Sequence, residues 1–170
     1  MISGQDREEL LDLIHRYACH ADNKEIVDLA GLFTEDGVLM VPDPPRTLLP
    51  ESKFKGRQQI ADRCAALRTI TATMHAIVGH TFFTIDASAR GSNDPHVEET
   101  ELLRGSVSCI ANHVRTRNSG EHVNTVWYLI YDDVYRRVGG RWYIQERRAR
   151  IKWIEEHRPA VVARTIKASR

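Results

Sequence analysis

The sequence predicts an α+β domain in which helices come first along the chain and an antiparallel sheet follows. Apolar residues recur at helical spacing in the first part of the chain, whereas long strand-like runs separated by turn-forming residues fill the second part. Because the sequence shows no repeat and no linker, we expect a single domain over residues 1–154, with helices covering one face of the sheet. Residues 155–170 are expected to form a tail that is flexible or docks on a partner subunit.

Three helices are predicted before the sheet. The first begins at Ser3, a favourable N-cap, and its apolar stripe ends near His20. The sequence Asp22-Asn23-Lys24-Glu25 is typical of a second helix start, because an acidic residue three positions after a capping side chain completes a capping box. A proline-rich loop over residues 42–56 then precedes a third helix over 57–67.

The strands are predicted from the runs that remain. They cover residues 38–41, 71–86, 98–117, 123–138 and 141–154. Turn-forming residues at 88–94 and 118–120 separate three of these runs, and Gly139-Gly140 is typical of a two-residue hairpin turn. We therefore expect sequential antiparallel pairing of the last four strands.

Charge and hydropathy limit the partners of the chain. Lys and Arg number 24 against 23 Asp and Glu, a net charge of +1, so binding to nucleic acid is not expected. No apolar run is long enough to cross a bilayer, so no membrane partner is expected either. The first residues lack the apolar core of a signal peptide, and we expect a cytoplasmic protein.

Cysteine and histidine spacing does not indicate a metal site. Cys19, Cys64 and Cys109 are odd in number and far apart, which predicts neither a disulfide framework nor a paired-cysteine zinc site. The eight histidines include no HExxH pattern and no tight cluster with acidic residues. We therefore expect no metal.

Several motifs resemble those of SnoaL-like proteins. In residues 16–38 the resemblance rests on Arg16-Tyr17, Asp22, Glu25 and the sequence Leu32-Phe33-Thr34-Glu35-Asp36-Gly37-Val38. It continues in Thr73-Met74-His75 with His80, and in residues 135–142 with Glu146-Arg147-Arg148, and spans about residues 8–153. SnoaL-like proteins form a branch of the nuclear transport factor 2-like superfamily, together with scytalone dehydratase-like proteins. The resemblance implies a cone-shaped domain whose curved, mixed sheet and three N-terminal helices enclose a cavity.

The resemblance also implies a function and a set of site residues. It implies a cavity for a small apolar organic ligand, a cofactor-free lyase or isomerase, and a homo-oligomer in which a second subunit covers the open sheet face. Scytalone dehydratase uses an acid and two histidines, which match Asp22, His75 and His113. Its two tyrosines have no match here. We therefore expect not scytalone but another polyketide-like, aromatic or terpenoid substrate, bound by the cavity-wall aromatics Tyr17, Tyr131 and Trp127.

The matched residues fit the chemistry of dehydration. Loss of water from a β-hydroxy carbonyl compound needs a base for a carbon-bound proton and a donor to the leaving hydroxyl, and an imidazole with a pKa of about 6.5 can serve as either. A carboxylate such as Asp22 can keep one ring nitrogen of His75 protonated, so that the other nitrogen is free to act as the base. We expect these two side chains to lie within hydrogen-bonding distance, about 2.6 to 3.2 Å.

Each site residue also has a structural interpretation. Asp22 can serve only as a helix cap, and His75, predicted on a strand face with Ile77 and Phe83, can be a core histidine bonded to backbone. His113 shares a face with apolar residues but lies near a hairpin, which favours exposure. The basic run over residues 147–150 is typical of a solvated face.

Two further functions stay open. In ketosteroid isomerases of the same superfamily, a tyrosine on the first helix and an aspartate before a proline serve the reaction, and Tyr17 and Asp43 resemble these residues. The other alternative is a non-catalytic ligand-binding domain, because a fold never establishes an activity.

Overall fold

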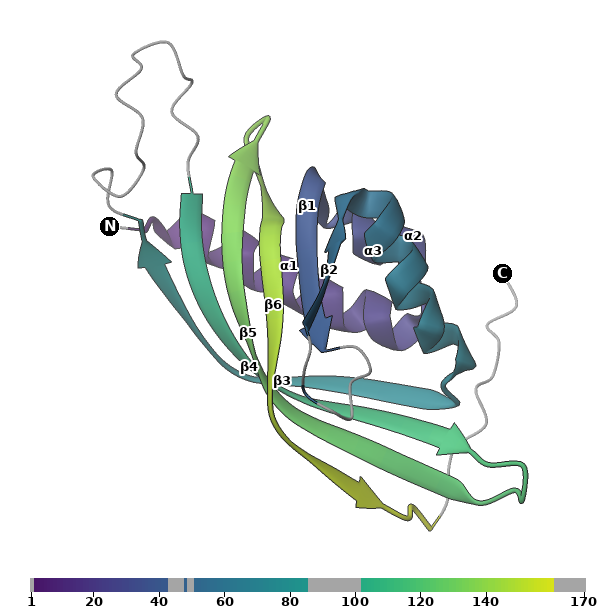
Figure 1. The fold of residues 1–170 in the computed structure, drawn as a ribbon. Coiled ribbons are helices and arrows are strands. Elements are labelled where there is room, and N and C mark those ends of the chain that lie inside the picture. The colour runs from purple at the N-terminus through teal and green to yellow at the C-terminus, as the bar shows by residue number, and fades with distance from the viewer. Residues whose placement is uncertain (1, 43–47, 49–50, 86–101, 161–170) are drawn as a thin grey trace.

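Three α-helices and one six-stranded sheet make up the fold (Figure 1). The computed structural model describes residues 2–42, 48, 51–85 and 102–160. The helices are α1 (Gly4–Asn23), α2 (Ile26–Gly31) and α3 (Gly56–Cys64), and a 3₁₀ helix (Ala65–Thr69) follows α3. The strands are β1 (Phe33–Pro42), β2 (Glu51–Lys55), β3 (Ala72–Thr84), β4 (Leu102–Thr116), β5 (His122–Val138) and β6 (Arg141–His157). None of the helices in the described residues is long and apolar enough to cross a membrane.

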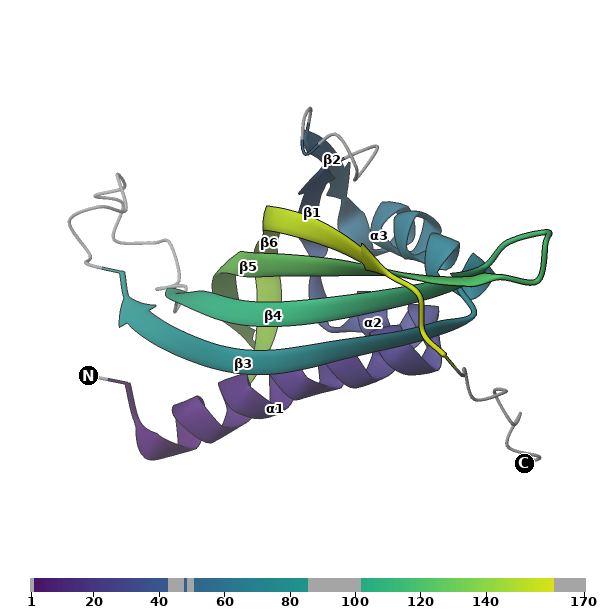
Figure 2. The same cartoon turned by 90° about the horizontal axis from the view of Figure 1, so that it is seen from below.

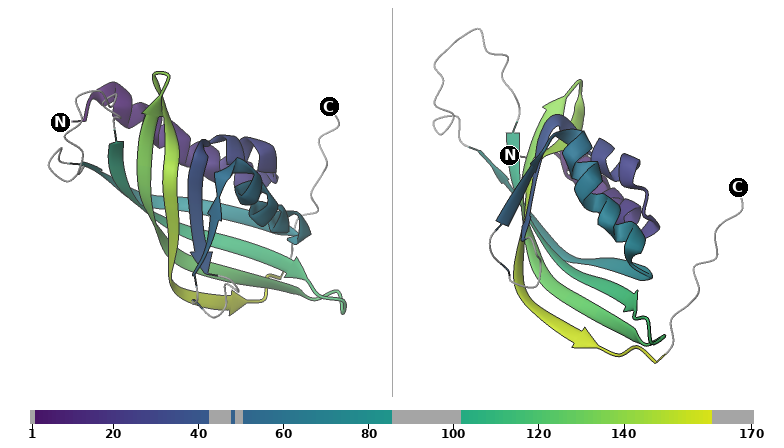
Figure 3. Two further views of the ribbon diagram at one scale, coloured as in Figure 1. Left: turned by 45° about the horizontal axis from the view of Figure 1, so that its top comes forward. Right: turned by 45° about the vertical axis from the view of Figure 1, so that its right-hand side comes forward.

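The sheet is mixed and open. Its order is β2-β1-β6-β5-β4-β3, and among these strands only β1 and β6 pair in parallel. Strands β3, β4, β5 and β6 pair antiparallel in chain order, which confirms the predicted sequential pairing of the last four strands. The sheet curves strongly, and the helices lie on its concave side (Figure 3), as the predicted fold class requires. Strand β2 was not predicted, because it lies within the proline-rich segment that the sequence indicated as a loop.

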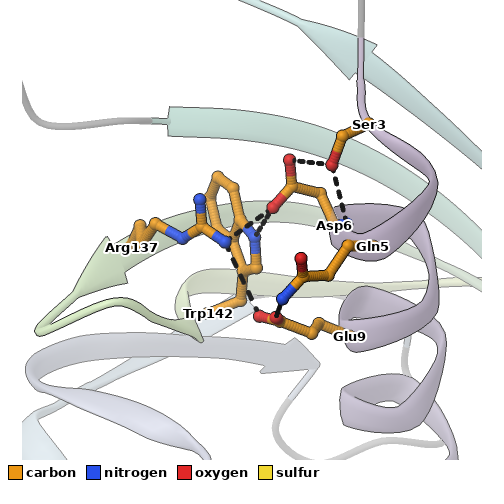
Figure 4. A network of polar contacts seen from close by, with 6 residues as sticks. All are labelled: Ser3, Gln5, Asp6, Glu9, Arg137 and Trp142. Atoms are coloured by element: carbon orange, nitrogen blue, oxygen red, sulfur yellow. Dashed lines mark hydrogen bonds and ion pairs between the residues drawn. The ribbon is translucent and has the colours of Figure 1, made fainter.

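A polar network attaches the start of α1 to the β5–β6 hairpin (Figure 4). The hydroxyl of Ser3 accepts a hydrogen bond from the backbone N–H of Asp6, which confirms the predicted N-cap. The carboxylate of Asp6 accepts hydrogen bonds from Arg137 at 2.7 Å and from the indole of Trp142 at 3.0 Å. Hydrogen bonds from Ser3 and Trp142, together with the charge of Arg137, lower the pKa of Asp6 and keep the network charged.

The end of α1 differs from the prediction. The helix continues through Asn23 and ends at Lys24, which adopts a left-handed conformation with φ of 61°. The backbone N–H of Glu25 then bonds to the carbonyl of His20 at 2.9 Å, a helix ending of the Schellman type. No side chain caps α2, so the predicted capping box of Asp22 and Glu25 is wrong, and the Asp22 carboxylate turns elsewhere.

Two of the predicted turns are present in the structure. Gly139 and Gly140, with φ of 55° and 81°, form the predicted two-residue turn between β5 and β6. The predicted turn at 118–120 is also present, whereas the one at 88–94 lies outside the described residues.

A bulge in β3 changes which side chains face the concave side. The register shifts between Ile77 and Gly79, so Phe82 is buried and Phe83 is 52% exposed, the reverse of the predicted face.

Strand β6 reaches beyond its predicted end. It continues to His157, three residues into the segment expected to be a tail. The flexibility or docking of residues 155–170 stays a prediction, since residues 161–170 lie outside the described part of the chain.

Candidate active site

A cavity of about 290 Å³ lies between the helices and the concave face of the sheet. Its walls come from α1, α3, the 3₁₀ helix and every strand except β2, and they are mostly apolar. Tyr17, Trp127 and Tyr131, the aromatics that the sequence assigned to ligand binding, all line it. His75 and His113 line it as well, whereas Asp22 lies behind His75 and is not part of the wall. The structure thus gathers these six predicted residues around one cavity.

Asp22 and His75 form a double contact between α1 and β3. The Asp22 carboxylate accepts a hydrogen bond from the His75 backbone N–H at 2.9 Å, and its other oxygen lies 2.7 Å from Nδ1 of the His75 ring. The predicted distance is confirmed. Only 7% of the His75 side chain is exposed, against 26% for Asp22. With Nδ1 engaged by the carboxylate, the ring presents Nε2 as the nitrogen free to act on a ligand.

The electrostatics of the pair favour an ionised Asp22. Partial burial raises the pKa of the carboxyl group, but hydrogen bonds from the His75 ring and backbone and the charge of that ring outweigh it. The pKa of Asp22 therefore lies below its ordinary value of 3.8. A charged carboxylate at neutral pH is what the orientation of His75 requires.

His113 is buried beside His75, so the expectation that it is exposed is wrong. His113 is 5% exposed. Its ring centroid lies 5.5 Å from that of His75 and 4.5 Å from that of Trp127. Burial alternates along β4 as far as His113, with Val107, Cys109 and Ala111 buried on the same face, so His113 belongs to the buried set. Burial, followed by the charge of His75, lowers the pKa of His113 to about 4, so the ring is neutral at pH 7.

A second buried charge pair lies below the cavity floor. Arg147 and Asp133 face each other across β6 and β5, and two hydrogen bonds of 2.9 and 2.6 Å join them. The guanidinium carbon lies 4.1 Å from the ring centroid of Tyr17 and 4.3 Å from that of Tyr131. Tyr135 donates a further hydrogen bond of 2.6 Å to Asp133. The predicted solvated face of residues 147–150 is therefore wrong for Arg147, which is 1% exposed.

The inward turn of Arg147 has a local cause. A register shift in β6 between Ile144 and Glu146 places Arg147 on the concave side. On β5 the alternation of buried residues Leu129, Tyr131, Asp133 and Tyr135 puts a carboxylate on an apolar face. That carboxylate was the available signal, because a buried charge needs a partner of opposite sign.

Two further features bear on the isomerase alternative and on the expected absence of a metal. Asp43, the base of the isomerase alternative, lies outside the described residues. Among the described residues, His20, Glu25 and Asp28 bring three possible metal ligands within 4.8 Å of one another, but none of them lines the cavity. His20 and Glu25 already bond to each other at 2.7 Å.

Sequence comparison assigns the family. The model of the SnoaL-like domain family matches residues 3–148, which is most of the chain. The chain belongs to the SnoaL-like domain family. No curated protein matches its sequence significantly.

Solved structures share the nuclear transport factor 2-like fold of this SnoaL-like protein. A provisionally named scytalone dehydratase from Novosphingobium aromaticivorans DSM 12444 is 19% identical, with 97% of this chain and 95% of that chain covered and a TM-score of 0.67. A type 2 hexachlorocyclohexane dehydrochlorinase (LinA) is 13% identical, with 95% of each chain covered and a TM-score of 0.71. ActVI-ORFA from Streptomyces coelicolor is 14% identical, with 86% and 96% covered and a TM-score of 0.61.

Two arginines of the cavity wall in this SnoaL-like protein were not predicted. Arg63 lies in the last turn of α3, and Arg115 lies two residues after His113 on β4. The second could have been found from strand alternation, because residues two positions apart share a face. Arg63 carries no comparable signal in the sequence.

The buried pair gives a first prediction. Replacement of Arg147 with Ala should lower the free energy of unfolding by about 3 to 5 kcal/mol, because it leaves the Asp133 carboxylate buried and unpaired. The matched control is Arg148→Ala. Arg148 binds the carboxylate of Glu51 at the surface, so its replacement should lower the free energy of unfolding by only about 0 to 1 kcal/mol. Urea unfolding measures both, and equal losses would contradict the assigned burial.

His113 gives a prediction about pH. The folded ring, with a pKa of about 4, stays neutral where the unfolded ring, with an ordinary pKa of 6.5, takes up a proton. The unfolded state therefore binds more protons between these values, and stability falls as the pH is lowered from 6.5 towards 4.

The variant His113→Gln should lack this contribution. Between pH 7 and pH 5 the wild type should lose about 2 kcal/mol more unfolding free energy than His113→Gln. Urea unfolding of both proteins at the two pH values measures the difference, and all other histidines are common to both. Parallel pH dependence in the two proteins would show that the His113 pKa is not lowered.

Proposed function

We propose that this SnoaL-like protein is a cofactor-independent lyase, a dehydratase in its simplest form, or a related isomerase, with His75 as its base. The observation that carries the proposal is the 2.7 Å contact of Asp22 with His75 at the wall of a mostly apolar cavity. A carboxylate, an imidazole and a mostly apolar cavity are elements of side-chain acid–base catalysis. Two proteins of the same fold bear the names of elimination enzymes, a scytalone dehydratase and a dehydrochlorinase.

The first step is removal of a proton from carbon. Asp22 accepts a hydrogen bond from Nδ1–H of the neutral His75 ring, so Nε2 takes the substrate proton as the C–H bond breaks. The carboxylate stabilises the imidazolium that forms, because the opposite charge is already in place and needs no reorganisation. An enolate, or its equivalent, remains in the cavity.

In the second step the leaving hydroxyl departs with a proton. The carbon–oxygen bond breaks, a carbon–carbon double bond forms, and the proton held on His75 passes to the departing oxygen to give water. His113 is suited to hold this oxygen by hydrogen bonding, since its ring is neutral at pH 7 and its Nδ1 is buried without a hydrogen-bond partner among the described residues. In an isomerase the same proton returns to a different carbon.

A donor for the substrate carbonyl is also available. Nε1 of Trp127 is buried at the cavity wall, also without a hydrogen-bond partner among the described residues. An indole nitrogen can only donate, so a substrate carbonyl oxygen is its natural partner. Tyr17 and Tyr131 contribute aromatic surface to the cavity wall. Burial raises the pKa of both phenols, so their hydroxyls stay protonated.

The cavity suits a compact substrate with a ring or a branched carbon skeleton. Its volume of about 290 Å³ and its aromatic wall favour a polyketide-like, aromatic or terpenoid compound. A homodimer in the cytoplasm remains the expected assembly, and the exposed apolar side chains Met74 and Val78 on β3 support association.

Turnover of a bicyclic β-hydroxy ketone tests the proposal. The wild type should convert 3-hydroxy-1-tetralone to 1-naphthol and should exchange the α hydrogens of 1-tetralone in D2O, followed by absorbance and by NMR. His75→Ala and Asp22→Asn should each lower both rates by about 100-fold or more, because the base or its orientation is lost.

His20→Ala is the matched control. His20 also lies on α1 and also contacts a carboxylate at 2.7 Å, but it does not line the cavity, so its replacement should leave both rates unchanged. A wild-type protein that binds a panel of such ketones and neither exchanges nor dehydrates them would contradict catalysis and indicate a binding domain.

A further inference from the structure

Two arginines from different layers of the fold line the cavity. Arg63 comes from α3 in the helical layer, and Arg115 comes from the end of β4 in the sheet (Figure 2). Both line the same space as His75 and Trp127, and none of the described lining residues is Asp or Glu. The described part of the wall therefore carries two positive charges and no acidic residue.

Among the described residues neither guanidinium has an acidic partner; Arg63 is partly buried, whereas Arg115 is exposed at the edge of the cavity wall. Within the part of the chain that the structure describes, no hydrogen bond or ion pair reaches Arg63 or Arg115, and Nε of Arg63 is buried without a partner. The guanidinium carbon of Arg63 lies 5.8 Å from the ring centroid of Phe54. Arg147 and Arg150, in contrast, each bind a carboxylate through two hydrogen bonds.

Unpaired guanidinium groups beside an apolar cavity favour an anionic ligand. A buried N–H donor without an acceptor costs free energy that a bound acceptor recovers, and low dielectric strengthens the attraction of an opposite charge. The planar guanidinium matches a carboxylate in geometry, with two parallel donors. The charge of Arg115 also acts on the neighbouring His113, so an anion held there lies next to the proton-transfer groups.

We infer that the substrate is a small organic acid, whose apolar body fills the cavity and whose carboxylate binds between Arg63 and Arg115. The inference rests on the proposed function only in taking this cavity as the substrate site. It narrows the substrate class to carboxylates and assigns the two arginines as specificity residues. Asp22 keeps its separate role, because it contacts His75 behind the wall and meets no substrate charge.

A pair of probes that differ only in charge tests this directly. Isothermal titration of the full chain with 2-naphthoate and with 2-naphthamide compares a carboxylate with a neutral group of nearly the same shape. The wild type should bind 2-naphthoate about tenfold more tightly than 2-naphthamide, the effect of one well-placed charge-assisted contact. The double variant Arg63→Gln/Arg115→Gln should bind the two probes equally.

Two controls separate this inference from the catalytic proposal. Arg68→Gln removes an equal charge from an exposed site just after α3 that does not line the cavity, and it should keep the tenfold preference of about 1.4 kcal/mol. His75→Ala should also keep the preference, even though it abolishes turnover. Loss of turnover and loss of anion preference are therefore independent results.

Several outcomes overturn the inference. Equal binding of both probes by the wild type, tighter binding of 2-naphthamide, or binding of neither probe would each exclude a carboxylate site. A preference that survives in a folded double variant, as judged by circular dichroism, would place the anion elsewhere. A preference that disappears equally in Arg68→Gln would reduce the effect to net charge.

Discussion

One carboxylate determines where the helical layer meets the sheet. Asp22, in the last turn of α1, accepts hydrogen bonds from both the backbone and the ring of His75 on β3. The left-handed Lys24 ends the helix two residues later, so the chain turns into α2 without using Asp22 as a cap. The same contact that places α1 against β3 (Figure 2) also orients the imidazole towards the cavity. Structure and proposed chemistry thus depend on one side chain.

The buried pair of Arg147 and Asp133 supports the cavity from the other side. Its guanidinium lies against the faces of Tyr17 and Tyr131, at 4.1 and 4.3 Å from their ring centroids. A buried ion pair is costly to form and strict in geometry, so it positions these two rings rather than adding much net stability. Arg147 is therefore engaged by Asp133, whereas Arg63 and Arg115 at the cavity wall have no acidic partner among the described residues and are available to a ligand.

Periodicity in the sequence predicted the helices, the long strands and their hairpins, because burial on one face leaves a regular pattern of apolar residues. It failed where the backbone departs from regular spacing. The bulges in β3 and β6 exchanged the faces of Phe82 and Phe83 and turned Arg147 inward. The contact of Asp22 with His75 came from the family resemblance, since residues 53 positions apart have no local signal of contact. Arg63 became a site residue only through packing in three dimensions.

We expect Asp22 to hold His75 in the tautomer that leaves Nε2 free. Nitrogen-15 NMR of the imidazole side chains, with His75 identified by the loss of its signals in His75→Gln, reports directly which ring nitrogen carries the proton. We expect a neutral His75 ring protonated at Nδ1, with Nε2 unprotonated. A ring protonated at Nε2 alone would contradict this expectation, because Nδ1 would then have no proton to donate to Asp22 and the nitrogen at the cavity could not act as a base.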